Sequence, residues 1–213
     1  MFEREKQEIL NCALMLDRYG LIALSGGNVS VRVSADKFLI TPSGMIYSEM
    51  VPSDVLLVDL DGNVVEGIRK PSLDTIAISH ILKNMPDVNA VIHTHQPYAT
   101  GIGLVTDRLD CDLTTLANAV KGHVNVAPYT SAACLDMGIA VVDNIGSQLA
   151  VILKNHGVVT VGKDLKEALY AAVYLEESAK TIFVAKAYGG EISKFSDEQI
   201  QTGIDVFKRY GQK

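Results

Sequence analysis

Apolar residues recur along the chain with two different spacings, which together predict a domain that mixes helices and strands. From residue 3 to residue 19 the apolar positions are three or four apart, the spacing of one helical face, and Gly20 follows as a stop signal. The other predicted helices are residues 73–83 with Ser72 as N-cap, about 164–187 opened by Asp164 and Glu167, and a last helix opened by Ser196 and Gln199 that ends near Tyr210.

Short apolar runs between turn signals predict strands. Asp61-Gly62 supplies the positive φ angles of a tight turn, so the runs on either side of it predict a hairpin. The predicted strands are residues 29–33, 38–41, 55–60, 63–65, 89–95, 149–153 and 158–161. Because there is no internal repeat and no linker-like tract, these elements predict one α/β domain over residues 1–213.

Charge and cysteine content narrow the choice of partners. Lys and Arg number 19 against 25 for Asp and Glu, so the net charge is −6, which disfavours binding to nucleic acid. The three cysteines are scattered without a CxxC spacing and are expected to be reduced thiols. We expect no signal peptide, because the first residues are charged, and no membrane span, because the longest uncharged stretch, residues 88–106, is too polar for a bilayer. We therefore expect a cytoplasmic protein with no membrane partner.

Two histidines share one predicted strand. His93 and His95 project from the same face of that strand, about 7 Å apart at Cα, so both imidazoles can meet one ion. A catalytic zinc site has three protein ligands and an open position, and His156, at a strand end in Asn-His-Gly, is the candidate third ligand. A lone histidine is more often a core residue, and that is our expectation for His80 and His123. The triplet instead predicts a metal site.

Five short segments occur together in an order that resembles a known family. They are GNVSVR from residue 27, ITPSG from residue 40, the Pro-Ser-x-acid helix start at 71–74, His-Thr-His and Asn-His-Gly. The set resembles the class II, zinc-dependent sugar-phosphate aldolases, most closely the fuculose-1-phosphate aldolases, within the aldolase, epimerase and adducin superfamily. The resemblance covers nearly the whole chain. It implies a three-layer α/β/α sandwich around a mostly antiparallel mixed sheet, and a homotetramer with active sites between subunits. The C-terminal helix and tail, residues 196–213, would then lie at an interface.

The resemblance also assigns roles in catalysis. It gives His93, His95 and His156 to one Zn²⁺ per subunit, proton transfer to Asp74, and a contribution to a neighbouring subunit's active site to Tyr210. Reversible aldol cleavage needs an acidified carbonyl, a base and a group that exchanges a proton with the C4 oxygen, and zinc, Asp74 and a tyrosine would supply these parts. Imidazole ligands also suit other divalent metals.

Phosphate binding is assigned to three loops. The positions that match the family's phosphate site are Gly27, Asn28, Ser43, Gly44 and Ser72. Glycines let backbone N–H groups turn toward an anion, and the start of a helix favours negative charge. The expected substrate is therefore a small sugar phosphate. The expected reaction is reversible cleavage of a fuculose-1-phosphate-like or 5-deoxypentulose-1-phosphate-like ketose to dihydroxyacetone phosphate and an aldehyde.

Three departures from the family pattern keep alternatives open. Leu73 replaces a second serine, Asp74 is one methylene shorter than the usual glutamate, and a tyrosine expected near Thr114 is absent. Asp74-Thr75 resembles the L-ribulose-5-phosphate 4-epimerases, although their HADYF-like segment is missing here. The alternatives are such an epimerase or a related metal-dependent sugar-acid phosphate decarboxylase. A non-catalytic adducin-like module is a remote third, since it would be expected to have lost the metal ligands.

Overall fold

A mixed sheet forms the centre of the protein. The computed structural model describes residues 1–207, and within them nine strands lie in the order β4-β3-β2-β1-β5-β9-β8-β7-β6. Neighbouring strands are antiparallel except β7 and β8, which are parallel. This confirms the expected mostly antiparallel mixed sheet. The strands are β1 Asn28–Arg32, β2 Lys37–Ile40, β3 Leu56–Asp59, β4 Val64–Glu66, β5 Ala90–Thr94, β6 Arg108–Leu109, β7 Val124–Ala127, β8 Ala150–Leu153 and β9 Gly157–Gly162.

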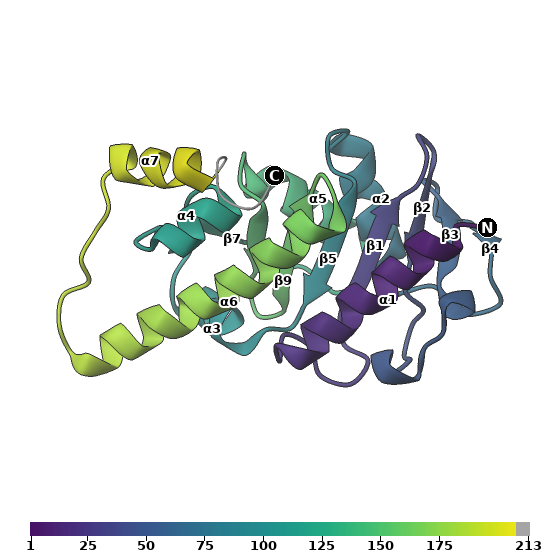
Figure 1. The fold of residues 1–213 in the computed structure, drawn as a ribbon, viewed down its shortest axis with the longest axis horizontal. Coiled ribbons are helices and arrows are strands. Elements are labelled where there is room, and N and C mark those ends of the chain that lie inside the picture. The colour runs from purple at the N-terminus through teal and green to yellow at the C-terminus, as the bar shows by residue number, and fades with distance from the viewer. Residues whose placement is uncertain (208–213) are drawn as a thin grey trace.

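Helices cover both faces of the sheet. One face packs against α2 and α5, while α1, α3, α4 and α6 pack on the other, where α1 and α6 cross the near side of the sheet in Figure 1. The expected three-layer α/β/α sandwich is therefore confirmed. The helices are α1 Glu3–Arg18, α2 Thr75–Asn84, α3 Pro97–Val105, α4 Thr114–Val120, α5 Leu135–Ile145, α6 Leu165–Tyr188 and α7 Asp197–Phe207, with short 3-10 turns at Tyr47–Glu49 and Pro52–Asp54.

Local sequence signals set several of the helix ends. Gly20 follows α1 with a φ of 69°, the left-handed conformation that glycine adopts without strain. At the start of α6 the Asp164 carboxylate accepts the Glu167 N–H at 2.8 Å. Ser196 and Gln199 accept each other's backbone N–H groups before α7, at 3.2 and 2.8 Å. These predicted helix starts are confirmed.

The predicted start of α2 was wrong. The N-cap is Asp74 rather than Ser72, and the helix begins at Thr75. The Ser72 carbonyl accepts both the backbone N–H of Thr75, at 3.1 Å, and its hydroxyl, at 2.6 Å, so Ser72 belongs to a turn that precedes the helix. The helices α3, α4 and α5 were not predicted, because glycines or short length obscure their periodicity.

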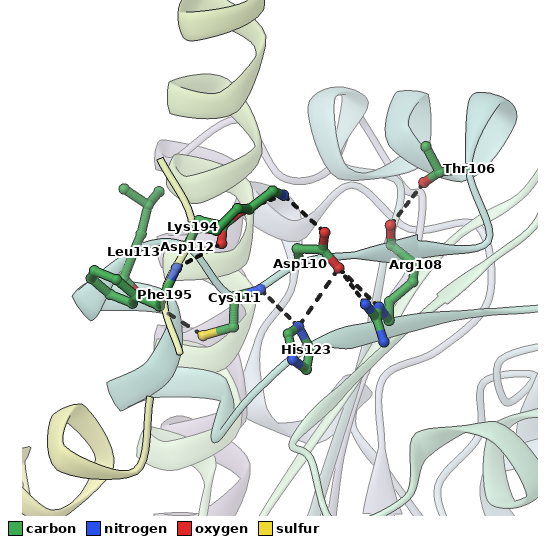
Figure 2. A network of polar contacts seen from close by, with 9 residues as sticks. All are labelled: Thr106, Arg108, Asp110, Cys111, Asp112, Leu113, His123, Lys194 and Phe195. Atoms are coloured by element: carbon green, nitrogen blue, oxygen red, sulfur yellow. Dashed lines mark hydrogen bonds and ion pairs between the residues drawn. The ribbon is translucent and has the colours of Figure 1, made fainter. Parts of the chain in front are cut away.

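The C-terminal part of the described chain is fastened to the edge of the sheet by a polar network (Figure 2). The Lys194 ammonium donates to Asp110 at 2.9 Å and to Asp112 at 2.7 Å. In the same network His123 Nδ1 accepts the Cys111 N–H at 3.0 Å, a structural contact. Beyond this network, α7 packs on α4.

Of the helices within residues 1–207, none combines the length and the apolar character that a bilayer crossing needs.

Candidate active site

Three histidine side chains meet at one end of the two central strands. His93 lies at the end of β5, His95 directly follows that strand, and His156 lies in the turn between β8 and β9. The Nε2 atoms of His93 and His95 are 3.1 Å apart, and one ligand nitrogen from each ring lies within 4.8 Å of the others. Because β5 pairs with β9, the turn that carries His156 is held against the end of β5. Strand pairing therefore brings together residues more than 60 positions apart.

His93 has a defined tautomer. Its Nδ1 lies 2.9 Å from the Val158 carbonyl oxygen, and since a carbonyl only accepts hydrogen bonds, Nδ1 carries the proton. The lone pair is therefore on Nε2, the atom that faces His95. Burial, reinforced by His156 and His95, lowers the pKa of His93 to about 3. Burial likewise lowers the pKa values of His95 and His156, so all three rings favour the neutral form that binds metals.

Two glycines, Gly27 and Gly157, lie so close to the strand that carries His93 and His95 that no side chain would fit at either position. A Cβ at Gly157 would lie 2.3 Å from the Thr94 carbonyl oxygen and 3.0 Å from the His95 ring, and one at Gly27 would lie 2.3 Å from the His93 carbonyl oxygen. Gly27 also has a φ of 76°. A side chain at either position would displace the strand end that carries the rings. The sequence predicted Gly27 as a phosphate contact, and the structure gives it this further packing role.

The donor set fits a metal ion. Bonds of about 2.0–2.1 Å at a tetrahedral angle put two ligand nitrogens about 3.3 Å apart, close to the observed separation of His93 and His95 Nε2. Two neutral imidazole lone pairs at this distance repel each other unless a cation or a proton lies between them. The half-exposed His156 and the more exposed His95 leave one side of the cluster open to a substrate. The three histidines could therefore hold a metal ion and leave one side of it open.

Asp74 lies beside the histidines, with a carboxylate that is turned away from its own helix. Its Oδ2 accepts from the Asn28 amide at 2.8 Å and its Oδ1 accepts from the Ala133 N–H at 3.2 Å, while it makes no capping bond to α2. Its negative charge raises the pKa values of His95 and His156, against the larger effect of burial. Asp74 is thus held by groups outside α2 and is electrostatically coupled to the cluster.

Asn28 is buried and only partly satisfied. Its side chain is 1% exposed, its amide nitrogen is bonded to Asp74, and its Oδ1 has no hydrogen-bond partner among residues 1–207. A carbonyl oxygen is an acceptor, so in this orientation it would repel a phosphate and would accept a hydroxyl. The side chain of Asn28 therefore orients Asp74, a role that the sequence analysis missed.

The two remaining predicted loops lie side by side. Pro42 pairs with Pro71, and the Ser43 N–H donates to the Lys70 carbonyl at 2.9 Å, so Ser43-Gly44 and Ser72 are brought together. The Ser43 N–H is consequently not available to a ligand. The Ser43 hydroxyl has no hydrogen bond to any residue in 1–207, and the space around Gly44 is open.

Two other contributing residues carried no sequence signal. The Tyr47 hydroxyl donates to the Gly27 carbonyl at 2.8 Å, which helps to fix the glycine loop. Ala133, which donates to Asp74, has a φ of 59° and so occupies a left-handed conformation that only its loop dictates. Nothing in their local sequence distinguishes either residue. Tyr210 lies outside the described residues.

Comparison with known proteins identifies the family. Residues 7–183 match the family model described as the class II aldolase and adducin N-terminal domain. The chain belongs to this family. It is similar to a 5-deoxy-D-ribulose 1-phosphate aldolase of Bacillus thuringiensis serovar kurstaki, 30% identical over the full length of both chains. It is also 29% identical to an L-fuculose phosphate aldolase of Escherichia coli K12, over 98% of this chain and 97% of the other.

A solved structure gives the same result for the fold. An L-fuculose 1-phosphate aldolase superposes with a TM-score of 0.89 at 30% identity, covering 95% of each chain. The class II aldolases are metal-dependent carbon–carbon lyases, and the three-histidine group of this family member could hold a metal ion. The predicted membership of the class II aldolase family is thus confirmed.

Proposed function

We propose that the protein is a zinc-dependent aldolase that reversibly cleaves a ketose 1-phosphate to dihydroxyacetone phosphate and a small aldehyde. The observation that carries the proposal is the convergence of three neutral imidazoles beside a carboxylate held by Asn28 and Ala133. The named activities of the relatives, on fuculose phosphate and 5-deoxy-D-ribulose 1-phosphate, support a substrate of the same class.

His93, His95 and His156 would hold the zinc ion. When bound, the ion acts as a Lewis acid that polarises the ketose carbonyl and offsets negative charge that develops next to it. The protein's part is to keep the rings neutral and fixed. The Val158 carbonyl fixes the His93 tautomer, and Gly157 lets the His95 ring pack close to the strand end.

Asp74 would transfer the proton at carbon. In the cleavage direction the C3–C4 bond breaks, the C4 hydroxyl loses its proton to give the aldehyde, and C3 gains a proton to give dihydroxyacetone phosphate. In the reverse direction the same carboxylate removes that proton from C3. The donors from Asn28 and Ala133 fix the carboxylate and leave it free of its own helix, so that a lone pair can face the substrate. By the family resemblance, Tyr210 would serve the C4 hydroxyl.

The phosphate would bind where the loops meet the start of α2. The Ser43 hydroxyl and the open space at Gly44 lie beside Ser72, and the amino end of a helix favours an anion. Gly27 and Asn28 are the other predicted phosphate contacts. They are connected to the start of α2 by the hydrogen bond from the Asn28 amide to Asp74. Leu73, 72% exposed, replaces one hydroxyl donor of the family, so the remaining groups would carry the phosphate.

The larger context follows from the same resemblance. We infer a single domain over residues 1–213, a homotetramer in the cytoplasm, and a C-terminal segment, residues 196–213, at an interface where Tyr210 reaches a neighbouring active site. Analytical ultracentrifugation and a Tyr210→Phe variant test this inference. A fully active monomer, or unchanged turnover in the variant, would contradict it.

A substrate panel tests the reaction itself. The zinc-loaded enzyme is incubated with L-fuculose 1-phosphate, 5-deoxyribulose 1-phosphate and L-ribulose 5-phosphate, and triose phosphate is measured with a coupled dehydrogenase. We expect dihydroxyacetone phosphate from at least one ketose 1-phosphate. Clean inversion at C4 of the pentulose 5-phosphate, with no triose phosphate from any compound, would identify an epimerase instead.

A further inference from the structure

Glu176 is a buried carboxylate that the proposed reaction does not use. It lies in the middle of α6 with an exposed fraction of 1%. Its Oε1 accepts the Tyr98 N–H at 3.1 Å and its Oε2 accepts the Ala99 N–H at 3.0 Å. Both donors belong to the first turn of α3, so a side chain from one helix caps the amino end of another.

The first turn of α3 depends on this cap. The N-cap residue, Gln96, makes no capping bond with its side chain, and Pro97 at the first helical position has no N–H to offer. The next two N–H groups lie before any intrahelical acceptor, and Glu176 satisfies both. With Gly101 and Gly103 in its nine residues, α3 has little intrinsic tendency to form.

Helix α6 also binds Gln96, the residue between His95 and the first residue of α3. Gln96 is fully buried, and its amide donates to the Ala172 carbonyl, one turn before Glu176, at 3.3 Å. Its Oε1 accepts the Thr94 hydroxyl at 2.7 Å. Both sequence neighbours of His95 are therefore held: Gln96 bonds to α6, and Thr94 bonds to Gln96. In addition, Pro97 restricts Gln96 to an extended backbone.

Burial raises the pKa of the Glu176 carboxyl, against the lowering effect of the two N–H groups and of Lys180. A neutral side chain of similar size would avoid that desolvation. Only a carboxylate, however, accepts two N–H groups at once through two oxygens. The two N–H groups of α3 therefore account for a charged side chain at this buried position.

We propose that Glu176 is a positioning residue: by fixing the first turn of α3, it sets the direction in which the His95 imidazole enters the metal site. The inference rests on the proposed function, since it treats His95 as a ligand. Helix α6 contributes no ligand, but through Glu176 it would determine how the His95 ring is oriented in the cluster.

The test compares two glutamates that each accept backbone N–H groups. In Glu176→Gln the side chain keeps its size, but one of its two acceptors becomes an NH₂ group that opposes an N–H. Glu167→Gln is the matched control, because Glu167, in the first turn of α6, accepts the Lys163 N–H at 2.8 Å and its side chain pairs with Lys121 rather than with α3. Glu176→Asp, which keeps the charge but reaches less far, is the second variant should Glu176→Gln fail to fold.

Two measurements decide the outcome. In metal-free protein, NMR of the histidine Cε1–H groups should show a shifted and broadened His95 signal in the Glu176 variants, with a smaller change for His156 and none in Glu167→Gln. Titration with Co²⁺, followed by its visible absorption, should show about tenfold weaker binding in the Glu176 variants and wild-type binding in the control. The melting temperature is recorded for all of them.

Wild-type His95 signals and wild-type Co²⁺ affinity in a folded Glu176 variant would overturn the proposal and leave Glu176 a purely structural cap. Absence of Co²⁺ binding by the wild-type protein would instead contradict the proposed function. In that case the metal-free NMR comparison still decides whether Glu176 positions His95.

Discussion

Helices α2 and α3 both begin near the histidine cluster, and they differ in how a carboxylate is used at the amino end. At α2 the N-cap carboxylate of Asp74 turns away from its helix toward Asn28 and Ala133. At α3 a carboxylate is brought in from α6 to close the helix end. Within residues 1–207, no carboxylate closes the amino end of α2, whereas both oxygens of Glu176 accept N–H groups from the first turn of α3. The open end suits a reacting anion, and the closed end suits a ligand that must not move.

The comparison predicts its largest effect at the open end. Asp74→Asn keeps the size of the side chain and the fold, and since an amide does not take a proton from carbon, turnover should fall by about 10²-fold or more. Steady-state kinetics checks this, with the metal content as a second readout. Lys83-paired Asp61→Asn, a surface change, is the control. Near-normal turnover with metal bound would mean that the base lies elsewhere.

A fall in pH should change the free energy of unfolding in opposite directions through His93 in the cluster and through Glu176 at the start of α3. The folded state lowers the pKa of His93 to about 3 from an ordinary 6.5, so this histidine stabilises the metal-free protein above pH 6.5. That stability is lost as pH falls, by about 1.4 kcal/mol for each pH unit. The raised pKa of Glu176 opposes this loss, because protonation at lower pH relieves its desolvation.

Urea unfolding of metal-free protein between pH 7 and 4 measures both contributions. We expect the free energy of unfolding to decrease toward pH 4, and to decrease more steeply in Glu176→Gln, which lacks the opposing group. A flat profile in the wild-type protein would show that the histidines are not buried in the neutral form.

A smaller effect is expected from an anion at the open end. If inorganic phosphate binds beside α2 with a Kd near 1 mM, 10 mM phosphate should stabilise the protein by about 1.4 kcal/mol, a rise in Tm of about 3–5 °C. Ser43→Ala should reduce this rise, because its hydroxyl faces no other partner in residues 1–207. Ser34→Ala, whose hydroxyl donates to Asp36, is the control and should keep it. An equal rise in both variants would place the anion elsewhere.

The smallest effect should come from the C-terminal network, in which Lys194 binds Asp110 and Asp112. Lys194 makes two ion pairs but is exposed, so Lys194→Ala should lower the free energy of unfolding by about 1 kcal/mol or less. Hydrogen exchange should show faster opening of α7, with metal affinity unchanged. A loss of metal binding would connect this network to the cluster.

Features of the site that follow from short-range rules could be predicted from the sequence. The alternation of side chains on a strand put His93 and His95 on one face, and the turn signal at Asn155 to Gly157 placed His156 at a strand end. The capping pairs before α6 and α7 are equally local. Each of these features depends on residues a few positions apart, so the sequence pattern records it, whereas the meeting of His156 with His93 comes from the pairing of β5 with β9.

Features that depend on long-range packing could not be predicted. Glu176 meets Ala99 across 77 positions, and Ala133 meets Asp74 across 59. The α3 sequence is too rich in glycine to be recognised as a helix without its distant cap.

Metal content tests the central claim most directly. Elemental analysis is made on wild-type protein, on His156→Ala, and on His80→Ala as a control histidine on α2 outside the cluster. We predict about one zinc-like ion per chain in the wild type and in the control, and none in His156→Ala, with activity lost on chelation and restored by Zn²⁺. Wild-type protein that holds no divalent metal, and whose activity is indifferent to chelators, would contradict the account.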